Sequence, residues 1–362
     1  MKFATTTACI LILAASALAE QLPDALTDQE FWRMVMEFSE AGGVFTQELM
    51  SNEDSAQFVI PTLKQTTRRG GVYIGVGPEQ NFTYLAALQP SIAFVVDIRR
   101  DNMLQHLMYK ALFELSSDRT DFLARLFSRK RPAGLDASSS VTTLFEALES
   151  APIDNTLYDE NVRAVLDQLV DKHKFQLSEA DTTRIAAFMN IFRTAGPYSL
   201  RGTGDKTLSY YQSMTATDLT GRHQSYLASE ENFRIVKELE ARNLIVPLVG
   251  DFAGDKAIVT IGRYLRDHEA KVATFYVSNV ERYLWDQGEH GRRFYANAAA
   301  LPLDQSSTFI RSATSDISRR LGVPLPDGTA NWRSFLSPMS DSLRAFAEGR
   351  VRTYREMFEI VR

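Results

Sequence analysis

The chain has 362 residues, enough for about two domains or for one large domain with an insertion. Hydrophobic residues make up 44% and charged residues 23%, which is ordinary for a globular chain and excludes a coiled coil, a collagen-like fibre and a disordered tail. The formal net charge of −5 lacks the basic excess of a nucleic-acid binder, so no nucleic-acid partner is expected.

The first 19 residues have the pattern of a secretory signal peptide. Lys2 precedes an apolar run, and Ala17-Leu18-Ala19 forms a small-x-small cleavage site before Glu20. The run is shorter than the roughly 20 residues that cross a bilayer, which favours cleavage over a membrane anchor. We therefore expect residues 1–19 to be removed and the mature protein to be exported, periplasmic or secreted, with no attachment to a membrane.

Two helices are expected before the first strand. Thr27-Asp28-Gln29-Glu30 is a capping box, and apolar residues follow it at helical spacing until Gly42-Gly43. A second helix is expected over residues 54–65, weakened by Pro61 because proline removes a backbone donor. A glycine-rich turn at 69–71 then leads into the central part of the chain.

A β-α-β-α unit follows this turn. Residues 72–74 form a short β-branched and aromatic run, and a helix is expected over 82–88. The apolar run 92–96 is typical of a strand buried on both faces of a parallel sheet. Helical patterns cover 104–115 and 121–127, and such a unit feeds a right-handed parallel sheet.

The alternation of strands and helices stops and later resumes. Residues 133–215 carry helical patterns at 142–148, 161–173 and 178–192, which predicts a mostly helical insertion or cap. The alternation resumes with the following elements: helix 230–242, strand 244–249, helix 255–268, strand 272–277, a further strand at 294–301, and a closing helix within 338–361. The sequence thus predicts an α/β fold, a three-layer Rossmann-like sheet in two halves, 20–132 and 216–362, around the insertion.

The clearest candidate site is the loop between the first strand and its helix. Gly75 and Gly77 stand there, and Asp97 ends the next strand 20 residues after Gly77. In Rossmann-like sites the glycines allow a ligand to approach the backbone, and the later acid bonds ribose hydroxyls. The third glycine of the dinucleotide fingerprint is replaced by Gln80, and Glu79 would stand near a pyrophosphate, so a nucleoside without a pyrophosphate fits better.

This arrangement resembles the class I S-adenosylmethionine-dependent methyltransferases, over about 65–115 and more loosely 230–300. The resemblance implies that Gly75, Gly77 and Asp97 hold S-adenosylmethionine. Tyr73 replaces the acid usual two residues before the first glycine, and Val249-Gly250-Asp251-Phe252 replaces the usual Asp/Asn-Pro-Pro-Tyr motif. The segments 75–82, 228–233 and 246–254 also resemble an uncharacterised family of secreted bacterial proteins, which implies no established activity.

The remaining candidates follow the later strands or complete the loop. Asp251, Asn279 and Glu281 come after two predicted strands, and the carboxyl ends of parallel strands share one edge of the sheet. We therefore expect them to line one crevice together with Gly77 and Asp97, and the insertion 133–215 to cover that edge as a lid. Pro78, Glu79 and Asn81 of the glycine-containing loop complete the candidate cofactor site. The alternative is that the acids cap separate helices and that the glycines only form a turn.

Two functions remain open on these grounds. One is an exported methyltransferase-like protein of uncertain activity that binds S-adenosylmethionine or a related nucleoside. The other is a non-catalytic secreted ligand-binding or interaction protein with a degenerate cofactor site. Export separates the protein from S-adenosylmethionine, which is made in the cytoplasm. The five histidines lack metal-ligand spacing and the mature part lacks cysteine, so no metal is expected.

Overall fold

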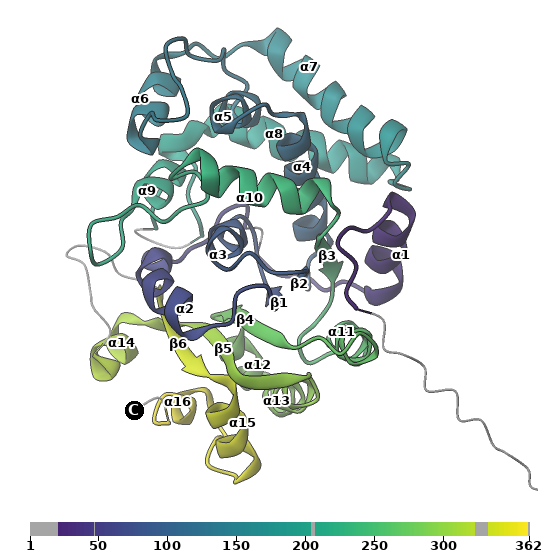
Figure 1. Ribbon diagram of the computed structural model, residues 1–362, viewed down its shortest axis with the longest axis vertical. Helices are drawn as coiled ribbons and strands as arrows, with labels where there is room; N and C mark the ends of the chain where they lie inside the picture. Colours follow the sequence, from purple (N-terminus) through teal and green to yellow (C-terminus); the bar gives the residue numbers. More distant parts are fainter. Residues whose placement is uncertain (1–20, 47, 204–206, 323–331, 361–362) are drawn as a thin grey trace, which may run out of the picture.

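The computed structural model describes residues 21–46, 48–203, 207–322 and 332–360 (Figure 1). The expected signal peptide therefore lies outside the described residues. Within them one sheet is formed by six strands: β1 (Val72–Gly75), β2 (Ala93–Asp97), β3 (Ile245–Val249), β4 (Val272–Ser278), β5 (Leu303–Thr314) and β6 (Trp332–Pro338).

The strand order in the sheet is β3-β2-β1-β4-β5-β6. Neighbouring strands run parallel from β3 to β5, whereas β6 runs antiparallel to β5 at the edge. The chain moves outward from β1 through β2 to β3, then returns to the other side of β1 with β4, so the winding reverses between β1 and β4. The expected α/β class is confirmed, and this open, mostly parallel sheet is compatible with a Rossmann-like fold.

One face of the sheet carries α3 (Gln80–Leu88) and α4 (Arg100–Leu115), with α10 (Glu230–Ala241) packed on both. Every residue of α3 is buried, because α10 and α2 pack against this helix and its Tyr84 contacts Tyr276 of the sheet. The helix expected at 54–65 is split into a 3-10 turn, η1 (Ala56–Val59), and α2 (Ile60–Thr66). Pro61 stands in the first turn of α2, where its missing N–H leaves no helical bond unmade.

The opposite face is covered by α1 (Asp28–Phe38), α11 (Ala257–Asp267), α12 (Val280–Asp286), α13 (His290–Ala299) and α15 (Met339–Ala347). The strand expected at 294–301 is wrong, because most of this stretch belongs to α13. Its buried residues, Gly291, Phe294, Tyr295 and Ala298, recur at helical spacing. The closing segment forms α15 (Met339–Ala347) and α16 (Tyr354–Met357), and α14 (Ser315–Leu321) follows β5.

The described part of the insertion is helical and lies on the α3–α4 face (Figure 1). It comprises α6 (Val141–Ser150), α7 (Asn155–Leu166), the π-helical η2 (Asp167–Lys172), α8 (Glu179–Ser199) and α9 (Tyr210–Thr215), beside α5 (Arg119–Leu126). Two ion pairs join α8 to α4, Asp181 with Arg100 at 2.8 Å and Arg184 with Asp101 at 2.5 Å. The insertion therefore adds a second helical layer over α4.

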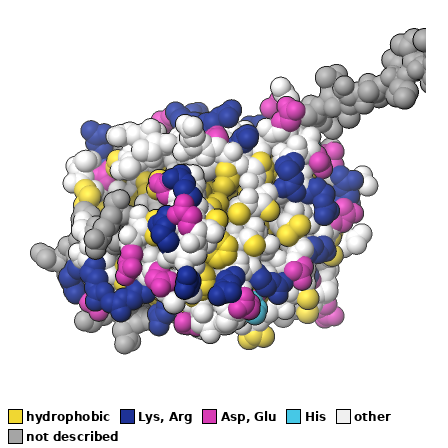
Figure 2. All heavy atoms as spheres, turned by 90° about the horizontal axis from the view of Figure 1, so that it is seen from below, with side chains coloured by type: hydrophobic (Ala, Val, Ile, Leu, Met, Phe, Trp, Pro, Cys, Tyr) yellow, Lys and Arg dark blue, Asp and Glu magenta, His cyan; other side chains and the backbone are white. Residues whose placement is uncertain are grey.

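Charged side chains of both signs are interspersed on the face shown in Figure 2, around apolar side chains near its centre. In the described part of the chain, no helix is both long and apolar enough to cross a membrane.

Candidate functional site

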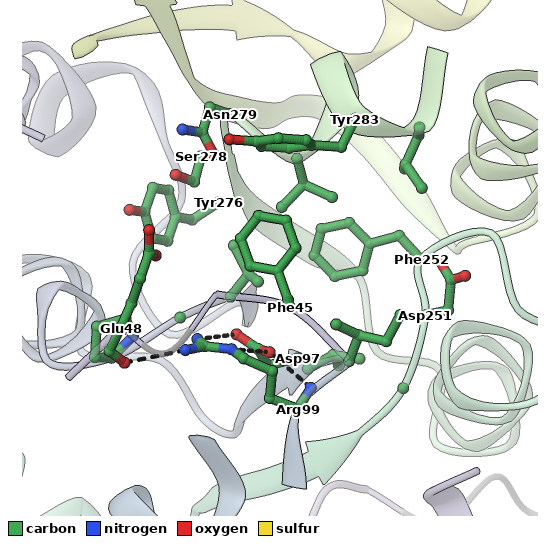
Figure 3. Close-up of a pocket in the computed structure, with 18 of the residues that line it drawn as sticks. Phe45, Glu48, Asp97, Arg99, Asp251, Phe252, Tyr276, Ser278, Asn279 and Tyr283 are labelled. Atoms are coloured by element: carbon green, nitrogen blue, oxygen red, sulfur yellow. Dashed lines mark hydrogen bonds and ion pairs between the residues drawn. The ribbon is translucent and has the colours of Figure 1, made fainter. Parts of the chain in front are cut away.

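A pocket of about 220 Å³ opens at the carboxyl ends of β1 to β4, beside the point where the winding reverses (Figure 3). Open α/β sheets bind ligands at this kind of crevice. The strand ends contribute residues 76–78, 96–99, 250–252, 276 and 278–280, and α12 with its C-cap adds Tyr283, Leu284 and Gln287. The remaining wall comes from the segment before β1, with Val44, Phe45, Glu48, Ser51 and Asn52.

The structure brings five of the nine candidate residues to this pocket: Gly77, Pro78, Asp97, Asp251 and Asn279. It places the other four away from the lining: Gly75, Glu79, Asn81 and Glu281. Cofactor binding by the five lining residues stays a prediction.

Gly75 and Asn81 build the turn that carries Gly77. The Asn81 side-chain amide donates to the three carbonyl groups of residues 76–78 at 2.7–3.0 Å. A Cβ atom on Gly75 would lie 2.0 Å from Asn81 Oδ1, so only glycine fits there. Gly77 has a φ of +75°, which glycine adopts without strain. The geometry of the turn alone therefore accounts for the presence of glycine at position 75 and asparagine at position 81.

Glu79 turns away from the loop surface and is fully buried. Both of its carboxyl oxygens lie 3.2 Å from the amide of Ser51, which donates to them, and burial raises the pKa of Glu79 to about 8. A carboxyl that keeps its proton inside the protein repels no phosphate, so the expected clash with a pyrophosphate is wrong. Two acids that do line the pocket, Glu48 and Asp251, disfavour an anionic ligand instead.

Asp97 is paired within its own strand end. Arg99 donates to it through Nε at 2.9 Å and Nη2 at 2.8 Å, and the Arg99 amide donates to Oδ1 at 2.9 Å. The remaining guanidinium nitrogen, Nη1, donates to the backbone carbonyl of Glu48 at 3.1 Å. Both charges are therefore largely satisfied inside the protein, and a ligand would meet a neutral pair at this point.

Asp251 and Asn279 differ in how far the protein uses their side chains. Asp251 accepts from the Ala253 amide at 2.8 Å, as the capping interpretation predicts. Asn279 is 9% exposed and lines the pocket, yet within the described residues its side-chain amide has no hydrogen-bond partner. Its polar group is thus available to a ligand.

Glu281 is not a pocket residue. It lies in the interior with Arg311, whose Nε is 2.7 Å from Glu281 Oε2, and the Tyr295 hydroxyl donates to it at 2.9 Å. Its place two residues after Asn279 turns it into α12 and toward the sheet rather than toward the strand ends. Glu281 is therefore a residue of the interior and not part of the pocket.

The sequence interpretation missed the wall formed by Phe45 and Glu48. The segment before β1 crosses the ends of β2 and β3, where the amide of Gly43 donates to the Ile98 carbonyl at 2.8 Å. A Cβ on Gly43 would lie 2.5 Å from the Ile98 side chain, so the Gly42-Gly43 pair permits a close crossing as well as ending α1. The Gly42-Gly43 pair was the one sequence feature from which this close crossing could have been predicted.

The expected lid is also wrong for the described residues, because none of those in 133–215 lines the pocket. The described part of the insertion touches the pocket wall from behind, where the Thr203 hydroxyl donates to Glu48 and Gly202 packs against the backbone of Ser51 and Asn52.

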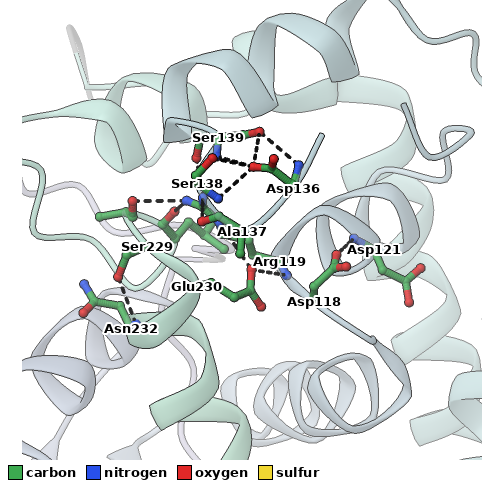
Figure 4. A network of polar contacts seen from close by, with 12 residues as sticks. Asp118, Arg119, Asp121, Asp136, Ala137, Ser138, Ser139, Ser229, Glu230 and Asn232 are labelled. Atoms are coloured by element: carbon green, nitrogen blue, oxygen red, sulfur yellow. Dashed lines mark hydrogen bonds and ion pairs between the residues drawn. The ribbon is translucent and has the colours of Figure 1, made fainter. Parts of the chain in front are cut away.

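The segment 228–233 lies in a separate polar network (Figure 4). Ser229 caps α10 by accepting from the Asn232 amide at 3.1 Å, and the buried Arg119 donates to the carbonyls of Leu227 and Ala228. This network joins α5 to the start of α10 and explains the segment structurally. No group of three or more metal-ligating side chains with metal-site geometry occurs in the described residues.

Residues 49–361 match the family model described as a domain of unknown function, DUF7790. The chain belongs to the DUF7790 family. The match begins at the pocket wall and includes the whole sheet, so the pocket lies within the DUF7790 domain apart from Val44, Phe45 and Glu48. A comparison with curated proteins gives no match.

Proposed function

We propose that this DUF7790 protein binds S-adenosylmethionine or a related nucleoside in the pocket at the strand ends, in the manner of the class I methyltransferases that its sequence resembles. The observation that carries the proposal is the position of the pocket beside the β1–β4 reversal, with Gly77 and Asp97 on its lining. Phe45, Phe252 and Tyr283 supply aromatic faces on which a base can stack.

The size of the pocket sets a condition on this binding. Pockets that bind drug-sized ligands have volumes of roughly 300–1,000 Å³, whereas this pocket has about 220 Å³. Val44 is fully exposed and Phe45 is 39% exposed, so the wall that they form is the part free to move outward. A nucleoside would enter with this wall displaced.

Isothermal titration with S-adenosylmethionine, S-adenosylhomocysteine and adenosine tests the proposal. Tyr283→Ala should weaken binding by about 10-fold, since base–aromatic stacking contributes on the order of 1–3 kcal/mol. The matched control is Tyr198→Ala, which removes a tyrosine that stacks on Tyr211 in the insertion. Absence of binding by all three compounds would exclude a nucleoside site.

A second function is favoured by the Asp97–Arg99 pair. Because both Asp97 oxygens already accept from Arg99, the ribose contact of the methyltransferase family is weakened. We therefore keep a non-catalytic binding protein with a degenerate cofactor site as the alternative. Binding without methyl transfer to any added acceptor would support it.

We also propose that the protein is exported to the periplasm or secreted, on the basis of residues 1–19. Mass spectrometry of the native protein should then find Glu20 as the first residue. An intact N-terminus in the cytoplasmic fraction would exclude export.

A further inference from the structure

The side of the pocket at the end of β4 offers hydrogen-bond acceptors rather than donors. The hydroxyls of Tyr276 and Ser278 both donate to Glu53 Oε1, at 2.8 and 2.5 Å. Glu53 is buried, and its other oxygen accepts from Ser334 at 2.8 Å. A hydroxyl has one proton, so once this is given to Glu53 only lone pairs remain for the cavity.

Glu48 adds a carboxylate to the same side. Figure 3 shows its side chain rising from the pocket wall beside Tyr276. It accepts from Thr203 and, at 3.4 Å, from Asn52, but no cation pairs with it in the described residues. Burial raises the pKa of Glu48 above its ordinary value, as expected for a carboxylate that lacks a partner cation.

The charges on the lining do not balance. Among the lining residues that the structure describes, Arg99 is the one cation, and its guanidinium is bonded to Asp97 through two nitrogens. Arg99 also acts on Glu48 from a distance, but among the described lining residues one cation stands against the three carboxylates of Glu48, Asp97 and Asp251. The unpartnered Asn279 amide, nine-tenths buried, can turn its carbonyl oxygen toward the same space.

Aromatic faces stand opposite these acceptors (Figure 3). Phe45 and Tyr283 meet edge to face with ring centres 5.0 Å apart, and Phe252 lies beside Phe45 on the lining. A cation over such rings is attracted by their electron-rich faces. Ser278 has a φ of +52°, unusual for serine, and such strain concentrates at functional sites.

We propose that the side of the pocket formed by Glu48, Tyr276, Ser278 and Asn279 receives a cationic group, an ammonium or a sulfonium, whose apolar substituents contact Phe45, Phe252 and Tyr283. This inference rests on the proposed function, because it places a charge requirement on the ligand of the same pocket. It selects a positively charged ligand over a neutral one of the same shape, a property that fold and glycine turn alone do not confer.

Two ligand pairs that differ mainly in charge test the inference. S-adenosylmethionine carries a sulfonium where S-adenosylhomocysteine has a neutral thioether, and choline has a neutral carbon isostere in dimethylbutanol. We expect the cation of each pair to bind about 10-fold more tightly by titration calorimetry or ligand-observed NMR, a difference of about 1.4 kcal/mol. Glu48→Gln should reduce this preference to less than about threefold, whereas Glu37→Gln, on the exposed side of α1, should leave it unchanged.

The outcomes separate the two proposals. If adenosine and both adenosyl compounds bind equally, the nucleoside site stands and the cation requirement is overturned. If no adenosyl compound binds but choline binds better than dimethylbutanol, the cation site stands and the nucleoside proposal fails. If Glu48→Gln is folded by circular dichroism and retains the full preference for the cation, the inference is overturned. Tyr276→Phe, which removes one acceptor and keeps the ring, should lower the preference in the same direction.

Discussion

Glu79 shows how a single buried carboxyl ties the stability of the protein to pH. Because burial raises its pKa to about 8, the folded protein keeps this proton at neutral pH, whereas the unfolded chain releases it near its ordinary value of 4.5. Between these two values the folded state holds more protons than the unfolded state. The free energy of unfolding must therefore fall as the pH rises from about 4.5 to about 8.

Glu79→Gln should remove this dependence, because glutamine still accepts from the Ser51 amide and does not ionise. At pH 7.5 we expect the variant to be more stable than the wild type by on the order of 1–3 kcal/mol, with no gain at pH 4.5. Urea unfolding at the two pH values measures the difference. Glu37→Gln, at an exposed position, should show no pH-dependent gain, and an equal gain at both pH values for Glu79→Gln would contradict this account.

The sequence revealed the residues that follow predictable strands and missed those that reach the pocket from a loop. Gly77, Asp97 and Asn279 were found because buried parallel strands appear as continuous apolar runs and their ends share an edge. Phe45 and Glu48 have no periodic context, and their place depends on bonds between the segment before β1 and the distant ends of β2 and β3. Such tertiary contacts leave no local pattern in a sequence.

At the scale of elements, strands β1–β4 were predictable from their sequence, whereas the antiparallel strands β5 and β6 were not. The central strands are mostly apolar, whereas β5 and β6 bury Arg311, Ser312, Arg333 and Ser334. Buried polar residues interrupt the apolar pattern, so neither strand was predicted. What replaces apolar packing there is the ion pair of Arg311 with Glu281, whose side chains are 0% and 1% exposed. This pair joins β5 to α12, the helix that also carries Tyr283.

Arg311→Met should destabilise the protein by about 3–5 kcal/mol, because it leaves the buried Glu281 charge unpaired. The double variant Arg311→Met/Glu281→Leu should recover most of this loss, since two apolar side chains need no partner charge. Chemical denaturation of the two single variants and the double variant gives the coupling energy. If the losses in free energy of unfolding of the two single variants add up in the double variant, the two residues act independently.

At the scale of the whole molecule, the insertion is held to the sheet-bearing part by carboxylates. Asp181 pairs with Arg100, and Glu114 on α4 lies 2.6 Å from His173 at the end of η2. The hydrogen bond from Arg100 lowers the pKa of Asp181 to about 2. Burial alone would raise the pKa of Glu114, but the hydrogen bonds and charges of His173 and Lys110 outweigh this effect and lower it to about 2. These contacts therefore contribute their full stabilisation at pH values above the ordinary carboxyl pKa values. The stabilisation is lost as the pH falls toward 2.

Acidification should release the insertion before the sheet unfolds. Between about pH 4 and pH 2, pulsed hydrogen exchange is expected to show loss of protection in α7 and α8 while β1, β2 and β3 stay protected. Asp181→Asn should shift the loss in α8 to higher pH, since its contact with Arg100 no longer carries charge. A single loss of protection across the insertion and the sheet together would contradict the separate attachment.

The segment that walls the pocket is bonded to residues that lie far along the chain. The amide of Glu40 donates to the Val249 carbonyl at 2.9 Å, and that of Gly43 reaches the end of β2. Because synthesis starts at the N-terminus, about 200 further residues must be made before β3 is present and the segment can form its bonds to it. A nascent chain that ends before β3 thus already contains many of the helices but cannot form the pocket. The ability to bind a ligand is among the last properties that the growing polypeptide acquires.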